Sequence, residues 1–216
     1  MDRSAVMATL SARWRAILER LGIDADAAGP TFADLVRAYS EEGRHYHTLD
    51  HIAALFLLLD WHGEGLADRN AVELAIFFHD AVYVPTRSDN EAESAELARA
   101  KLTALGLPAT LVTRVADLIL ATRHGTEQAE PHDADLALLL DLDLSVLAAD
   151  RPVYAAYAQA IRSEYAVYPD LVYRPGRRRV LGQFLARPRI YRTGRLHELW
   201  DAAARANLEW ELAELG

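Results

Sequence analysis

Residues 4–21 read SAVMATLSARWRAILERL, and their apolar residues recur with the 3.6-residue period of an amphipathic helix. Gly22 follows directly and is a typical helix terminator. The same period recurs through almost the whole sequence, which has no convincing run of alternating residues bounded by hairpin signals. We therefore predict an all-α fold, built as a compact multi-helix domain.

The predicted helices begin and end at recognisable signals. Pro30 suits a first helical turn, Asn70 and Asp89 suit N-caps, and Gly106 suits a helix end. The predicted helices cover residues 4–21, 31–39, 48–61, 71–79, 90–105, 108–122, 133–147, 152–165, 177–185 and 196–215. Because no Gly-, Pro- or Ser-rich linker and no internal repeat separates them, we expect residues 1–216 to form a single domain.

The composition limits the class of protein. The chain is 51% apolar and 25% charged, as ordinary globular proteins are. Its longest apolar run, residues 52–59, is less than half of the about 18 residues that cross a bilayer, so we expect no membrane span. The chain has no cysteine, which excludes disulfides, zinc–thiolate sites and cysteine nucleophiles. Since the first residues also lack the apolar core of a secretory signal, we expect a cytoplasmic enzyme or binding protein.

The charge distribution bears on partners. A net charge of −9 disfavours binding to extended nucleic acid, which needs a basic surface. Eight arginines nevertheless crowd residues 174–195, and the chain has no glycine-rich phosphate loop. We expect Arg174 and Arg178 to hold a substrate phosphate, because they flank Pro175-Gly176, where we predict a turn and a helix N-terminus. The alternative is a solvated cluster that balances the acidic surface.

Ionisable residues interrupt two strongly apolar segments. His79-Asp80 follows the apolar residues 75–78, at the end of a helix that we expect to be buried. Asp141 and Asp143 lie within the leucine-rich residues 138–144. A buried charge is costly unless it is paired or binds a metal. The two aspartates are about 200° apart around a helix, so only one of them could easily face a shared ion.

A shared divalent cation would satisfy these groups together with a histidine from a third segment. His47 and His51 are four residues apart and therefore share a helix face. His51, His79, Asp80 and Asp143 would supply two imidazoles and two carboxylates, a set that suits Mn, Fe, Co, Ni or Mg better than a closed zinc site. The alternative is a surface helix start whose histidines only cap and hydrogen bond.

A wider set of motifs accompanies these residues. They are RHYH at 44–47, FHD at 78–80, DNE at 89–91, SA at 94–95, DLDL at 141–144, IRSEY at 161–165 and RANL at 205–208. Together they resemble the HD superfamily of metal-dependent phosphohydrolases, and in particular a bacterial subfamily of this length described only as predicted HD phosphohydrolases. The resemblance implies hydrolysis of a phosphoester or phosphoanhydride in a small phosphorylated molecule such as a nucleotide. It also implies His51, His79, Asp80 and Asp143 as metal ligands, with Asp143 preferred over Asp141.

The segment around His47 has a second resemblance. Tyr46-His47-Thr48-Leu49-Asp50-His51 is similar to the Tyr-His-Asn-x-x-His motif of cyclic nucleotide phosphodiesterases, whose first His is a general acid. This implies that His47 donates a proton and His51 binds metal, although the two could be exchanged. We count His47 and Asp80 as the catalytic residues. Relatives often carry an acid after the Tyr that follows the HD pair, whereas Val84 follows Tyr83 here, so the role of that loop stays open.

Further residues are candidates for substrate contact. Arg44, Glu91 and His124 are predicted to bind substrate, and His124 could instead bind a second metal or be a solvated loop histidine. His132 and Asp135 could extend a second metal site. Extra histidines in this interval leave a di-iron oxygenase of the HD type as an alternative function, and a non-catalytic ligand-binding regulator as a third. A homodimer is compatible with the sequence.

Overall fold

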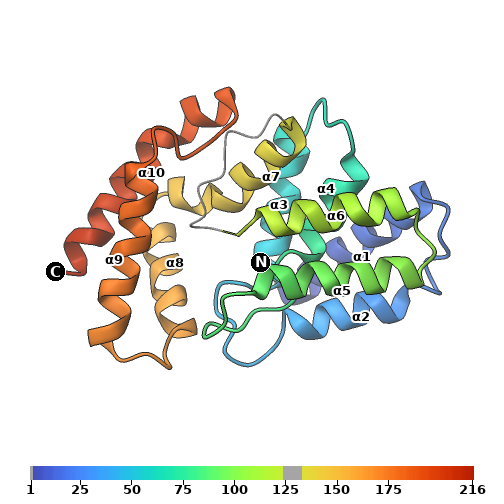
Figure 1. The fold of residues 1–216 in the computed structure, drawn as a ribbon, viewed down its shortest axis with the longest axis horizontal. Helices are drawn as coiled ribbons and strands as arrows, with labels where there is room; N and C mark the ends of the chain where they lie inside the picture. The colour runs from blue at the N-terminus through green and yellow to red at the C-terminus, as the bar shows by residue number, and fades with distance from the viewer. Residues whose placement is uncertain (1, 124–132) are drawn as a thin grey trace. The chain divides into compact units, whose positions relative to one another are not determined.

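The computed structural model describes residues 2–123 and 133–216, and every regular element in these residues is a helix (Figure 1). The prediction of an all-α fold is therefore confirmed. Among these residues, none of the helices combines the length and the apolar character that a membrane span requires. The chain divides into two compact units, Met1–Arg123 and His124–Gly216, which we describe separately. The single functional domain over residues 1–216 stays a prediction.

The first unit is built around one central helix. Its six helices are α1 (Arg3–Arg20), α2 (Gly29–Ala38), α3 (Leu49–His62), α4 (Arg69–Phe78), α5 (Asn90–Ala104) and α6 (Ala109–Ala121). Helix α4 packs against α1, α3, α5 and α6, and every residue from 71 to 78 is buried. The ring of Phe77 on α4 lies 5.3 Å from that of Trp14 on α1 and 4.8 Å from that of Phe56 on α3. Helix α4 thus carries its C-terminal residues into the core of the unit.

Most helix ends of the first unit lie within two residues of the predicted positions. Gly22 and Gly106 follow α1 and α5 with φ of 69° and 78°, a conformation that glycine adopts without strain. The predicted N-cap at Asn70 is wrong, because the Asp68 carboxylate accepts the N–H of Ala71 at 2.9 Å. Asp89 occupies the N-cap position of α5, but its carboxylate pairs with Arg87 instead of accepting a helical N–H.

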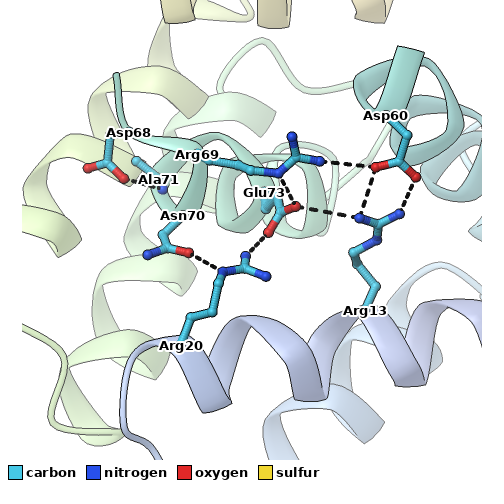
Figure 2. Close-up of polar contacts among 8 residues, drawn as sticks. All are labelled: Arg13, Arg20, Asp60, Asp68, Arg69, Asn70, Ala71 and Glu73. Carbon is cyan, nitrogen blue, oxygen red and sulfur yellow. Dashed lines mark hydrogen bonds and ion pairs between the residues drawn. The ribbon is translucent and has the colours of Figure 1, made fainter. Parts of the chain in front are cut away.

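A carboxylate on α4 lies at the centre of a charged network that joins three helices (Figure 2). Glu73 is fully buried and pairs with Arg20 of α1 and with Arg69 at 3.0 Å. Arg13 of α1 and Arg69 both reach Asp60 on α3, each with a contact of 3.0 Å. Because a buried carboxylate is stable only when it is paired, these contacts compensate Glu73 and fix the N-terminal half of α4 against α1 and α3.

The second unit contains an α-helix that continues directly into a short 3-10 helix, followed by three long helices. Its elements are α7 (Ala134–Asp143), the short 3-10 helix η1 (Leu144–Ala148), α8 (Arg151–Glu164), α9 (Asp170–Ala186) and α10 (Gly194–Glu214). The helix predicted over residues 133–147 therefore changes character at Leu144. Helix α10 packs against η1, α8 and α9. Inside the unit, Arg177 of α9 makes a bidentate pair with Glu211 of α10, which also accepts the hydroxyl of Tyr154 on α8.

The predicted start of the ninth helix at residue 177 is wrong. Helix α9 begins at Asp170 and includes Pro175 and Gly176, where we expected a turn. Proline at this position removes only the hydrogen bond to the carbonyl of Leu171, one turn earlier. Leu171 is 90% exposed, so water can satisfy its carbonyl group. A proline this close to a helix start is compatible with a continuous helix.

Candidate metal centre

His79 and Asp80 lie where α4 ends. His79 is the C-cap residue of α4 and is 2% exposed. Its Nδ1 lies 3.0 Å from the carbonyl oxygen of Ile76, which can only accept a hydrogen bond. Nδ1 of the neutral ring therefore carries the proton, and Nε2 has a lone pair available. A hydrogen bond from the distal ring nitrogen to a backbone carbonyl is the arrangement that usually orients a metal-binding histidine.

His51 brings a second imidazole to the same point. It lies in the first turn of α3, is 6% exposed, and its Nε2 is 3.3 Å from Nε2 of His79. An Oδ2 atom of Asp80 lies 3.0 Å from the same His79 nitrogen. His51, His79 and Asp80 each offer a ligand atom within 4.8 Å of the others, so this part of the predicted ligand set could hold a metal ion.

The chemistry of these donors fits a divalent cation. Two ring nitrogens that face each other at 3.3 Å repel if both present lone pairs, unless a proton or a cation lies between them. The set combines nitrogen and carboxylate oxygen without sulfur, which suits Mn, Fe, Co, Ni or Mg. Both histidines are buried, and a buried ionisable group is stable when it is paired or binds a metal. The residues therefore fit the predicted cofactor, whose identity stays a prediction.

His47 lies beside these ligands, in the loop before α3. Its Nε2 is 3.9 Å from Oδ2 of Asp80, and its side chain is 17% exposed. The ring of Tyr83 lies 4.1 Å from the imidazole of His47, centroid to centroid, at an interplanar angle of 30°. The ring of Tyr46 lies 4.9 Å from that of His51. His47 is thus close to the ligand group and partly accessible, as a proton donor must be.

The two aspartates of α7 differ in their surroundings within the second unit. Asp141 is buried, and its Oδ1 accepts the N–H of Arg192 at 2.7 Å. Its Oδ2 accepts both the N–H and the hydroxyl of Thr193, each at 2.7 Å. Burial raises the pKa of Asp141, and these hydrogen bonds oppose that shift. Both oxygens of Asp141 therefore hold the segment that begins α10.

Asp143 is the last residue of α7 and is only partly buried. Because Asp141 is committed to Arg192 and Thr193, Asp143 is the better candidate of the two for a metal ligand. Its role as the fourth ligand stays a prediction, as does its preference over Asp141.

Arg44 contacts backbone carbonyls of two segments that carry predicted site residues. Its Nη1 donates to the carbonyl of His47 at 3.2 Å and to that of Asp80 at 2.7 Å. Nη2 donates to the carbonyl of Ala81 at 3.0 Å. The side chain is 3% exposed, and Nε lies 3.6 Å from a carboxylate oxygen of Glu41. This geometry gives the predicted substrate-binding residue a clear role in holding the backbone of the site.

The start of α5 contributes residues whose role the sequence did not reveal. Glu91 is partly buried in the first turn of α5, and its predicted contact with substrate stays a prediction. The neighbouring Asn90 and Ser94 instead bind the loop after Asp80, through the backbone of Val84 and Val82 respectively. In the sequence, only the motifs at residues 89–91 and 94–95 pointed to these residues, and the motifs did not indicate what the side chains bind.

The arginines of α9 contact the end of α10. Arg174 donates to the carbonyl of Leu215 at 3.3 Å, and Arg178 donates to the carbonyl of Leu212 at 2.8 Å. These carbonyls lie in the last turn and the C-cap of α10, where guanidinium groups are favourable. The predicted turn and helix N-terminus between Arg174 and Arg178 are absent, since both residues lie within α9. Their binding of a phosphate stays a prediction without that support.

Other motif residues of the second unit also bind backbone carbonyls. Arg162 donates to the carbonyls of Tyr165 and Tyr168, and Asn207 donates to those of Leu147 and Ala149. These motifs therefore have an architectural role in the unit.

His124 and His132, the candidates for substrate binding or a second metal, lie outside the described residues. Asp135, their proposed companion, is described and buried, at the start of α7.

Comparison with known proteins gave no match, either to a family model or among curated proteins and solved structures. Membership of the HD superfamily stays a prediction from the residues of the sequence.

Proposed function

We propose that this chain is a metal-dependent phosphohydrolase of the HD type. It would act on a phosphoester or phosphoanhydride bond in a small phosphorylated molecule such as a nucleotide. The observation that carries the proposal is the convergence of His51, His79 and Asp80, whose ligand atoms lie within 4.8 Å of one another. Their order along the chain and their residue types match the pattern of the superfamily that the sequence resembles.

The three residues, with Asp143 as the proposed fourth ligand, would hold the cation. A divalent cation held there would supply Lewis-acid polarisation of the phosphoryl group and a bound water of lowered pKa. His79 keeps its Nε2 available because its Nδ1 donates to Ile76. Asp80 supplies negative charge next to both imidazoles, which favours a cation over a neutral ligand.

His47 would protonate the leaving oxygen. Imidazole is the side chain best suited to donate a proton near neutral pH. The His47 ring lies 3.9 Å from Asp80 and keeps part of its surface exposed, so a substrate could reach it.

The proposal is tested by metal analysis and a substrate panel. Protein purified without chelator is analysed for metal and assayed for phosphate release with Mn²⁺, Co²⁺, Ni²⁺ or Mg²⁺ on phosphomonoesters, cyclic nucleotides and nucleotides. We expect about one cation per chain and metal-dependent phosphate release. In Asp80→Ala and His51→Ala, metal occupancy and turnover should fall together, because each variant removes a ligand.

His47→Ala should keep its metal and lose roughly 100-fold or more of turnover, the usual cost of removing a general acid. His45→Ala is the matched control, because His45 is exposed and lies in the same loop. Loss of metal in His47→Ala would mean that His47 and His51 have exchanged roles. Two irons per chain with oxygen-dependent turnover would support the oxygenase, and metal without turnover on any substrate would support the regulator.

A further inference from the structure

The loop after Asp80 is held to α5 on both sides of Tyr83. The hydroxyl of Ser94 accepts the N–H of Val82 at 3.0 Å and lies 3.3 Å from its carbonyl, to which it donates. The side-chain amide of Asn90 accepts the N–H of Val84 at 3.0 Å and donates to the carbonyl of Val84 at 3.0 Å. Each residue next to Tyr83 therefore has both backbone polar groups bound by one side chain of α5. This clamp fixes the position from which the Tyr83 ring projects.

The ring of Tyr83 takes part in a continuous stack of side chains. Its centroid lies 4.1 Å from that of His47, at an interplanar angle of 30°. The guanidinium carbon of Arg44 lies 5.6 Å from the Tyr83 centroid and 5.2 Å from that of Tyr39. The hydroxyl of Tyr39 donates to the carbonyl of Phe77 on α4 at 3.0 Å. The stack thus connects the core of the first unit to His47.

The guanidinium of Arg44 also joins the two backbone segments between which the stack lies. Its Nη atoms bind the carbonyl of His47 and those of Asp80 and Ala81. With its side chain 3% exposed, Arg44 uses its terminal donors inside the protein. A lysine could not reproduce these contacts, because its single ammonium lacks the planar fork of arginine.

We propose that Tyr83 is a positioning residue that fixes the orientation of the His47 imidazole, through the clamp of Asn90 and Ser94. Arg44 supports this arrangement by joining the backbone of His47 to that of Asp80, and it does not contact substrate. The contacts from which we infer this orientation all lie within the first unit. Its effect on turnover rests on the proposed function, in which His47 donates a proton.

Proton donation depends strongly on orientation. A donor must present its nitrogen within hydrogen-bonding distance of the leaving oxygen, and a displacement of about 1 Å can cost about 100-fold in rate. Packing of the Tyr83 ring against the imidazole restricts the rotation of the His47 side chain. The stacking needs an aromatic ring at position 83 and does not need the tyrosine hydroxyl.

The test compares Tyr83→Phe, which keeps the ring, with Tyr83→Ala, which removes it. Val84→Ala is the matched control, because the Val84 side chain is 41% exposed and only its backbone is bound by Asn90. The first readout is NMR of the imidazole protons of His47, assigned with His47→Gln. We expect nuclear Overhauser effects between the rings at positions 83 and 47 in the wild type and in Tyr83→Phe. In Tyr83→Ala, the His47 protons should lose the upfield shift that a facing aromatic ring causes.

The second readout is metal content together with turnover. Tyr83→Ala should bind metal normally and lose about 10- to 100-fold in kcat, with Tyr83→Phe and Val84→Ala close to wild type. Arg44→Lys should lower kcat with little change in KM, since Arg44 does not contact substrate. Unchanged His47 resonances in Tyr83→Ala, or equal losses in Tyr83→Phe and Tyr83→Ala, would overturn the proposal. If the wild type binds metal and turns over no substrate, the proposed function fails, and the NMR readout still decides the role of Tyr83.

Discussion

Replacing Asp141 by alanine should destabilise the second unit and leave metal affinity intact, whereas replacing Asp143 by alanine should do the reverse. The two residues are neighbours on α7 and identical in type, so each variant serves as the control for the other. Asp141 binds the backbone of Arg192 and Thr193, directly before α10. Asp143 is the proposed fourth ligand of the metal.

The size of the first effect follows from the hydrogen bonds that are lost. Asp141 accepts three, each at 2.7 Å, and two of them come from backbone N–H groups. A hydrogen bond to a charged group contributes about 1.5–3 kcal/mol. Because burial of the carboxylate, which raises its pKa, offsets part of this gain, we expect a net loss of about 2–4 kcal/mol.

Two measurements separate the variants. Urea unfolding followed by circular dichroism gives the free energy of unfolding, and competition with a chromophoric chelator gives the affinity for Co²⁺ or Mn²⁺. Loss of a residue that only orients a metal ligand lowers metal affinity about 10- to 100-fold. In Asp143→Ala, which removes a proposed ligand, metal affinity should fall by more than this, and the stability of the metal-free protein should not change. Asp141→Asn keeps the shape of the side chain and should cost less than Asp141→Ala. A normal free energy of unfolding with lost metal affinity in Asp141→Ala would refute this assignment of the helix face.

Three further predictions concern stability. Glu73→Gln should lower the free energy of unfolding in urea by about 3 kcal/mol. This is the lower end of the range of about 3–5 kcal/mol for a broken buried pair, because the arginine partners of Glu73 are 22–41% exposed. The control Glu42→Gln, at an exposed position, should change it very little. Burial acts to raise the pKa of Asp201, but hydrogen bonds from Arg205 and the N–H of Ile190 outweigh it and lower the pKa. The contribution of Asp201 to the free energy of unfolding is therefore present above the ordinary pKa of 3.8 and is lost as the pH falls through the lowered pKa. Urea unfolding of Asp201→Asn and wild type should therefore differ at neutral pH and converge in acid. Finally, a cation at about 100 times its Kd should raise the free energy of unfolding by about 2.7 kcal/mol, and a chelator should reverse this; no shift in the unfolding curve would argue against a native metal site.

The sequence predicted the helices well wherever local chemistry determines their ends. Gly22 and Gly106 end α1 and α5 because their positive φ is costly for other residues. The start of α9 was missed because Pro175 usually ends a helix, and its tolerance here depends on the exposure of Leu171, which no local pattern encodes. The cap of α4 was assigned to Asn70 and not to Asp68, although both residue types can cap a helix. The choice between them depends on which side chain is already bound by another helix, and the sequence does not show this. Arg20 binds Asn70 in the structure.

The candidate site divides in the same way. His51, His79 and Asp80 could be identified from the sequence, because ionisable residues in apolar helices require a partner. The contacts that position them could not. Asn90 and Ser94 bind backbone N–H and carbonyl groups. Every residue has these groups, so the sequence does not show which residues Asn90 and Ser94 bind. Arg44 was predicted to bind substrate because an arginine near a predicted phosphate site is an obvious ligand, and that contact stays a prediction. Its contacts with the carbonyls of Asp80 and Ala81 had no signature in the residue types.

The burial of α4 also has a consequence for how the site opens. Every residue from 71 to 78 is buried, and Glu73 pairs with Arg13 and Arg20 of α1. A helix in this position exchanges its amide hydrogens only in the rare events that unfold the whole unit. His79 follows α4 directly, so local fraying, which usually releases residues at a helix end, is suppressed there. Release of His79 from the ligand group should therefore occur only at the rate of global unfolding of the first unit.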